Sequence, residues 1–168
     1  EAAWWNMDNI HWNNAVPGFV LHQADPLATV REPCLTDPGF LAQTRDWLNK
    51  RYIDPDRARW EEIGQIWADE WNYPCARDME TGICHSPTCL ERFRRALKQD
   101  YGSLQDVNRE WDTAFKSWAD VVPPTLAEVR AAPDRWAAAW ADHRAHQDSV
   151  VAAYMLVLNR AAGRAVPG

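Results

Sequence analysis

The segment Ile63-Gly-Gln-Ile-Trp-Ala-Asp-Glu-Trp-Asn72 runs through a short apolar stretch and stops at two adjacent carboxylates, Asp69 and Glu70. Its apolar residues are too few for a free-standing amphipathic helix, whereas a continuous apolar run of this length is typical of a buried strand in a parallel sheet. In parallel α/β folds, functional groups project from the C-terminal ends of the strands. Glu70 closes this predicted strand and is therefore a candidate proton donor. The alternative is a carboxylate that caps a helix or forms a salt bridge.

The composition limits the kind of protein. The chain has 168 residues, 46% of them hydrophobic, with a formal net charge of −6, which is enough for one globular core. No cluster of Lys and Arg is present to bind phosphates, so we expect no nucleic-acid partner. We also expect no membrane span, because no apolar run reaches about 18 residues. The first residue is not Met and the last residues begin a new apolar segment, so we expect a fragment; cytoplasmic and secreted locations both stay open.

Helices are predicted on both sides of the central segment. Thr36-Asp-Pro38 supplies a capping residue and a Pro, followed by apolar residues at helical spacing that predict a helix over 38–52. Ser86-Pro87 begins a second helix, which Gly102 closes. Further helices are predicted over 104–111, 126–131 and 134–161, the last of them ended by Gly163.

The chain contains 11 Trp residues, and eight of them form two groups. Those at helical spacing with other apolar residues are predicted core positions: Trp47, Trp111, Trp136 and Trp140. Those near predicted loops or strand ends are Trp4, Trp5, Trp12 and Trp71. An indole there can stack on the apolar face of a sugar ring while its N–H reaches a hydroxyl. Trp71 and Asn72, next to Glu70, are therefore candidate substrate-binding residues.

The run from Cys89 to Trp118 resembles the segment that follows the catalytic acid in family 42 glycoside hydrolases, the β-galactosidase group, and in their relatives. The similarity consists of a Phe-Arg pair, Tyr-Gly, a Leu followed by Asn, and a closing Trp-x-x-x-Phe-x-x-Trp, all in the same order. Arg31-x-x-Cys34-Leu-x-Asp-Pro38 and Asp69-Glu70 upstream, and Trp140-x-Asp-His-Arg144 downstream, also fall in the family's order. The resemblance covers residues 29–168.

This resemblance implies an incomplete glycoside hydrolase domain, truncated at both ends. The implied fold is α/β, the middle of a (β/α)8 TIM barrel that is helix-rich as a fragment, since a complete barrel takes ~250 residues. Glu70 would be the general acid/base at the end of the fourth strand of a retaining, β-galactosidase-like enzyme, and the nucleophile would lie past Gly168. The fragment alone would be inactive. The alternative is a non-catalytic carbohydrate-binding or scaffolding barrel; a homo-oligomer of the full-length protein stays open.

Two positions near the implied acid bear on the substrate, a carbohydrate. Family members carry Asn before the acid, where it meets a sugar hydroxyl, whereas this chain has Asp69, so the choice of sugar stays open. Asp69 would raise the pKa of Glu70 by like-charge repulsion if both side chains face the pocket. Arg31 matches a family Arg and either binds a sugar hydroxyl or a carboxylate, or forms a helix-capping salt bridge.

The cysteines form a second set of candidate residues. The chain has one Cys upstream of the implied acid and three downstream: Cys34, then Cys75, Cys84 and Cys89. β-Galactosidases of the family can hold a structural zinc with this arrangement, and four thiolates fit a closed tetrahedral site. The spacing here lacks the family's Cys-x-Cys-x-x-Cys cluster, and His85 is a competing ligand. Two disulfides, or free thiols, are the alternatives.

Overall fold

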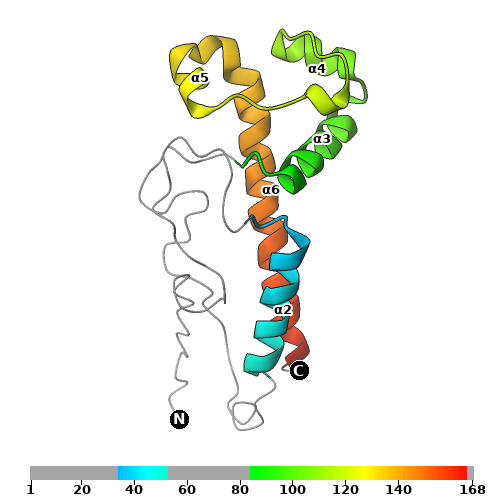
Figure 1. Cartoon of the computed structure of the whole chain (residues 1–168), viewed down its shortest axis with the longest axis vertical. Coiled ribbons are helices and arrows are strands. Elements are labelled where there is room, and N and C mark those ends of the chain that lie inside the picture. Colours follow the sequence, from blue (N-terminus) through cyan, green and yellow to red (C-terminus); the bar gives the residue numbers. More distant parts are fainter. Residues whose placement is uncertain (1–33, 53–83, 166–168) are drawn as a thin grey trace.

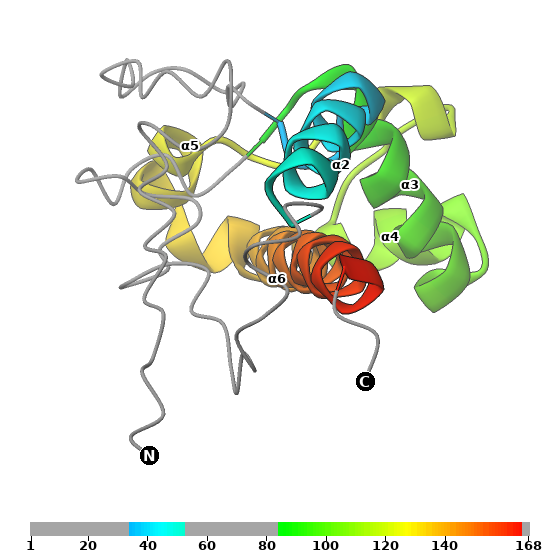
Figure 2. The ribbon, with the colours of Figure 1, turned by 90° about the horizontal axis from the view of Figure 1, so that it is seen from below.

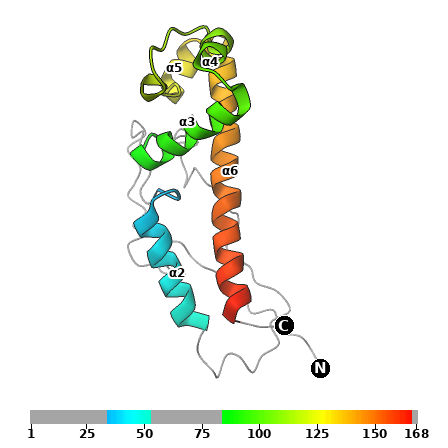
Figure 3. The ribbon, with the colours of Figure 1, turned by 90° about the vertical axis from the view of Figure 1, so that its right-hand side faces the viewer.

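The computed structural model describes residues 34–52 and 84–165, and every regular element in these ranges is a helix. The elements are α2 (Pro38–Tyr52), α3 (Pro87–Tyr101), α4 (Leu104–Trp111), the short 3-10 helix η2 (Trp118–Asp120), α5 (Leu126–Ala131) and α6 (Pro133–Ala165). At 33 residues, α6 is about 50 Å long. It forms the spine of the described structure: α2 lies along one half of it, and α3, α4 and α5 gather around the other half (Figure 1; Figure 3).

The expected partial (β/α)8 barrel is wrong for the described residues, which contain no strand. In a barrel each helix packs on a sheet, and strands alternate with helices along the chain. Here α3, α4 and α5 follow one another through loops, and each of them packs against α6 (Figure 2). The apolar faces of these helices are therefore covered by other helices. The predicted strand over 63–72 lies outside the described residues.

The capping signals in the sequence explain where the described helices begin and end. The Ser86 side chain accepts a hydrogen bond from a backbone N–H in the first turn of α3, and Pro87 occupies the first helical position. Gly102 ends this helix with φ +76°, a left-handed conformation that an L side chain rarely adopts. Ser103 and Thr125 cap α4 and α5 in the same way. The predicted bounds of these helices, and of α2, are confirmed.

The long helix α6 differs from the prediction at its C-terminal end. It continues through Gly163 to Ala165, so the prediction that Gly163 ends it is wrong. A glycine inside a helix costs only about 1 kcal/mol relative to Ala and leaves the backbone hydrogen bonds possible, so it does not force an end. None of the helices that the structure describes is long and apolar enough to cross a membrane.

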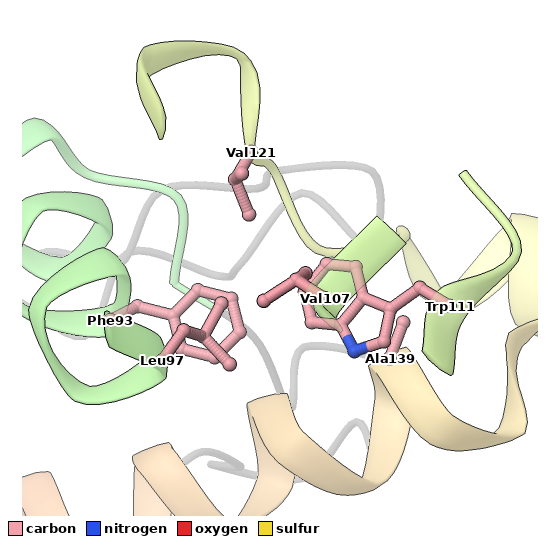
Figure 4. Close-up of a cluster of buried hydrophobic side chains, with 6 residues drawn as sticks. All are labelled: Phe93, Leu97, Val107, Trp111, Val121 and Ala139. Atoms are coloured by element: carbon pink, nitrogen blue, oxygen red, sulfur yellow. The ribbon is translucent and has the colours of Figure 1, made fainter. Parts of the chain in front are cut away.

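A buried apolar cluster holds α3 and α4 against α6. Its members come from α3, α4, the loop before α5, and α6, and are drawn in Figure 4: Phe93, Leu97, Val107, Trp111, Val121 and Ala139. Trp111 is 2% exposed, and its indole N–H donates to Asp142 of α6 at 2.8 Å. Its predicted core position is confirmed. Trp136 and Trp140 are half-buried, and the side chain of Trp47 lies outside the described residues.

A second contact joins α2 to the other half of α6. The ring of Phe40 stacks on the ring of Tyr154, with centroids 5.9 Å apart. Val150 and Leu158, on the same helix as Tyr154, are also buried. Between this contact and the apolar cluster, the segments that precede α2 and α3 meet at the middle of α6 (Figure 3). The cysteines lie at this junction.

Candidate metal centre

Three cysteines that lie far apart in the sequence come together at the start of α2 and α3. Cys34 precedes α2, Cys84 lies just before the cap of α3, and Cys89 is in the first turn of α3. Their exposed fractions are 8%, 0% and 1%, and their three sulfur atoms all lie within 4.8 Å of one another. All three are free thiols, so none of the described cysteines forms a disulfide.

The spacing of the three sulfur atoms fits a tetrahedral metal. Four thiolates about 2.3 Å from a zinc ion lie about 3.8 Å from one another. The sulfur atoms of Cys84 and Cys34 are 3.7 Å apart. The fourth cysteine implied by the resemblance, Cys75, lies outside the described residues. His85 does not belong to the group; its ring packs against the ring of His143 instead, at 5.7 Å.

Cys34 is the acceptor at the centre of a hydrogen-bond network. The Ser86 hydroxyl donates to its sulfur at 2.9 Å, and the Thr36 hydroxyl lies 3.0 Å from it. Hydrogen bonds from Cys84 and Cys89, with help from these hydroxyls, hold the pKa of the Cys34 thiol well below its ordinary value, although burial acts in the opposite direction. These hydrogen bonds favour negative charge on Cys34.

The same network acts in the opposite direction on Cys89. The pKa of Cys89 is raised by its hydrogen bonds to Cys34 and Cys84 and by burial. Negative charge on Cys34 thus opposes a second negative charge on Cys89. A bound cation removes this opposition, because a coordinating thiol is deprotonated outright. The donor set therefore fits a divalent, thiolate-binding metal such as zinc.

Helix α6 adds two polar side chains to the cysteine cluster. The Nε2 atom of His146 lies 3.5 Å from the sulfur of Cys89, and the Gln147 amide donates to the same sulfur at 3.6 Å. Gln147 also contacts Nε2 of His143 at 3.0 Å. Burial, followed by neighbouring positive charges, lowers the pKa of His143 to about 3 and that of His146 to about 4. Both imidazoles are therefore neutral near pH 7.

The sequence reasoning missed His146 and Gln147. It identified His143 only as part of the family-like segment Trp140-x-Asp-His-Arg144. A signal was present: His143, His146 and Gln147 stand at positions i, i+3 and i+4, and therefore share one face of a helix. Three polar residues on the otherwise apolar face of a predicted helix indicate a buried polar site at that face.

A polar groove of about 680 Å³ adjoins the cluster, between the start of α2, α3 and α6. Its lining comprises Thr36, Pro38, Thr88, Glu91, Arg92, Arg95, Ala96, Gln99, His146 and Ser149. Thr36, Thr88 and His146 each contact a cysteine sulfur, so these three side chains stand between the cluster and the groove. Small molecules in the groove would meet them before reaching the thiols.

The residues predicted to act on the substrate are not part of this centre. They are Arg31, Asp69, Glu70, Trp71 and Asn72, and all five lie outside the described residues. Their roles stay predictions. The described part of the site is the thiol cluster with its hydrogen-bonding partners.

Comparison with known families identifies the chain. A family model described as beta-galactosidase, Glyco_hydro_42, matches residues 73–156, which is half of the 168 residues. The matched range contains the whole Cys89–Trp118 run and most of α6. The chain therefore belongs to glycoside hydrolase family 42, which confirms the resemblance seen in the sequence.

Two curated proteins are similar to short parts of the chain. A thermophilic beta-amylase from Thermoanaerobacterium thermosulfurigenes is 31% identical over 55 residues, which are 33% of this chain and 9% of that protein. Beta-galactosidase BgaA from Planococcus sp. is 32% identical over 50 residues, which are 27% of this chain and 7% of that protein. The chain thus spans less than a tenth of these relatives. No solved structure matches it significantly.

Proposed function

We propose that this protein hydrolyses O-glycosidic bonds and that Glu70 is its general acid/base. One observation carries the proposal: the family match covers residues 73–156 and so begins three positions after Glu70. The resemblance described in the sequence analysis likewise implies that Glu70 is the acid that precedes this segment. The two similar proteins support the same class, because one is named a beta-amylase and the other a beta-galactosidase.

The proposed chemistry is a double displacement with retention of configuration. Glu70 protonates the leaving oxygen in the first step and deprotonates the attacking water in the second. This cycle requires a second carboxylate as nucleophile, about 5–5.5 Å from the first. Asp69 raises the pKa of Glu70 if the two carboxylates face each other, which favours the protonated form that the first step needs.

We propose a β-galactoside as the substrate. The support is the description of the matching family and the name of the Planococcus relative. Trp71 and Asn72 are proposed to contact the sugar, Trp71 through the face of its indole ring and Asn72 through its amide. Arg31 is proposed to bind a sugar hydroxyl or to orient a carboxylate.

The test compares Glu70→Gln with the wild type, in the protein with its natural termini. Two β-galactosides are used, one with an activated aryl leaving group and one with a sugar leaving group. Gln cannot donate a proton, so we expect kcat/KM for the sugar leaving group to fall by about 10²–10⁴-fold. The loss should be much smaller for the aryl compound, whose leaving group departs without a proton.

The matched control is Asp69→Asn, which introduces the residue that family members carry at this position. If Asp69 raises the pKa of Glu70, this variant should lose some activity on the sugar leaving group, in the same direction as Glu70→Gln but by far less, because a general acid is still present. Equal losses on both substrates in Glu70→Gln would show that Glu70 is not the acid.

We also propose that the thiol cluster holds a structural zinc, with Cys34, Cys84, Cys89 and Cys75 as ligands. The support is the spacing of the three described sulfur atoms and their burial. A closed thiolate site supplies folding free energy and no open coordination position for a substrate. Its effect here would be to tie the segment before α2 to the first turn of α3.

A further inference from the structure

Cys89 is held from two directions, by its own helix and by α6. Its backbone N–H donates to the Ser86 hydroxyl at 3.2 Å, within the cap of α3. Its sulfur contacts His146 and Gln147, which lie 57 and 58 positions further along the chain. These are long-range contacts from side chains to one thiol, and they come from adjacent positions on a single helix.

The two α6 residues are not themselves in position to bind the metal. Among the described residues, the group of potential ligand atoms that lie within 4.8 Å of one another consists of the three sulfur atoms alone. His146 approaches only the sulfur of Cys89, and the Gln147 contact is a donated N–H bond to that sulfur. His146 and Gln147 therefore lie where side chains hydrogen-bond a metal ligand and fix the orientation of that ligand.

The orientation of Gln147 is itself fixed. An amide nitrogen carries two hydrogens, so Gln147 can donate to Cys89 and to Nε2 of His143 at the same time. His143 is in turn packed between aromatic rings, with the ring of Phe93 at 5.4 Å and that of Trp140 at 6.2 Å. A chain of contacts therefore runs from the core of the helix bundle through Gln147 to the thiol.

These polar side chains are costly to bury. His143 and Gln147 are each 1% exposed, and His146 is 4% exposed. Nδ1 of His143 and Oε1 of Gln147 are buried with no hydrogen-bond partner among the described residues. An unsatisfied buried polar atom lowers the stability of the folded state. An apolar α6 of the same shape would avoid this cost, which favours a role for the polar atoms that face Cys89.

We propose that His146 and Gln147 are positioning residues of the metal centre: their side chains hydrogen-bond the Cys89 sulfur and so couple metal retention to the placement of α6. This inference rests on the zinc site proposed above. His146 also lines the groove, so it separates the sulfur of Cys89 from small molecules there. Loss of its ring should therefore also speed removal of the metal by a chelator.

The first test measures zinc affinity by competition with a chromogenic zinc indicator in the protein with its natural termini. The variants are Gln147→Leu and His146→Leu, which remove the hydrogen bond and keep most of the volume. We expect each to weaken zinc binding by about 10–100-fold, the usual effect of losing such a partner. His146→Gln places an amide nitrogen near the position of Nε2 and should restore most of the affinity.

The matched control is Val150→Ala. Val150 is 1% exposed on the same helix, so its truncation destabilises α6 without removing a hydrogen bond to a cysteine. We expect this variant to melt earlier than the wild type and to bind zinc with unchanged affinity. If the Leu variants do not fold, Gln147→Asn and His146→Asn take their place, because each withdraws the polar atom from the sulfur while remaining polar.

The second test uses cobalt(II) in place of zinc. Hydrogen bonds withdraw electron density from a thiolate, so their loss should shift the sulfur-to-cobalt charge-transfer absorption of Gln147→Leu to longer wavelength, with no shift in Val150→Ala. A wild type that binds neither metal would overturn the zinc site and this inference together. Metal binding in the wild type with the same affinity and spectrum in the Leu variants would overturn this inference alone.

Discussion

At the scale of single residues, Ser86 has two functions. Its hydroxyl oxygen accepts the Cys89 N–H at the start of α3, and its hydroxyl hydrogen is donated to the Cys34 sulfur at 2.9 Å. The first contact is a helix cap, which the sequence predicts from Ser86-Pro87. The second could not be predicted, because 52 positions separate the two residues and no local pattern links them.

Because Ser86 has two functions, removing this cap should destabilise the protein more than removing the cap of α4. Ser86→Ala should lower the free energy of unfolding by about 2–4 kcal/mol, because it removes a cap and a buried hydrogen bond to the Cys34 sulfur. Ser103→Ala removes the cap of α4 and the hydroxyl's local hydrogen bond to the Asp106 carboxylate, but no long-range contact, and should cost about 1 kcal/mol. Denaturant unfolding of the metal-free proteins measures both values. Equal costs would mean that the Ser86–Cys34 bond contributes nothing to stability.

At the scale of elements, the helices were predictable and their partners were not. Proline at the first turn, a hydroxyl cap and glycine with positive φ are local signals, so the bounds of α3 follow from its own sequence. An apolar helical face, however, fits a sheet or another helix equally well. The sheet was expected because the family resemblance implies a barrel. In the described residues, the helices pack against one another instead. The polar residues His143, His146 and Gln147 on one face of α6 indicated that this face meets other polar groups, here the cysteine cluster.

The buried histidines of α6 predict a pH dependence of stability. Burial lowers the pKa of His143 from 6.5 to about 3, so the folded protein keeps this ring neutral while the unfolded chain takes up a proton below pH 6.5. Its stabilisation is fully present above pH 6.5 and is lost as the pH falls towards 3. His146 behaves in the same way towards pH 4. Acid should therefore destabilise the fold well before carboxylates titrate.

The measurement is denaturant unfolding of the metal-free protein between pH 7 and pH 4. His143→Gln removes one of the titrating rings while retaining a polar side chain. Between pH 6 and pH 4, the free energy of unfolding of this variant should fall less steeply than that of the wild type, by about 1.4 kcal/mol per pH unit. Identical slopes would show that His143 is already protonated in the folded protein.

At the scale of the whole molecule, the thiol cluster joins parts of the chain that are far apart in the sequence. Cys34 belongs to the segment before α2, and Cys84 and Cys89 to the start of α3. The sequence indicated a four-cysteine site through the family resemblance, and the structure brings three of its members together. The position of the acid, Glu70, rests on the sequence alone.

The zinc proposal predicts that metal content and stability change together. The protein with its natural termini should contain about one zinc per chain. At free zinc 1,000 times above Kd, binding stabilises the fold by about 4 kcal/mol, which corresponds to a shift in Tm of about 8–16 °C for a domain of this size. A strong chelator should remove this shift. Cys89→Ser should lose both the metal and the response to chelator, whereas Glu70→Gln should keep both.

Helix α6 packs against two separate sets of side chains. One end is held by the Phe93–Trp111 cluster and the other by the Phe40–Tyr154 stack, with the cysteines between them. Amide hydrogens along one helix normally exchange with solvent according to the unit that protects them. With metal at the junction, both halves of α6 should open together. Without the metal, the amides near Ala139 and those near Tyr154 should exchange with different free energies of opening. The two halves of one continuous helix would then differ in local stability.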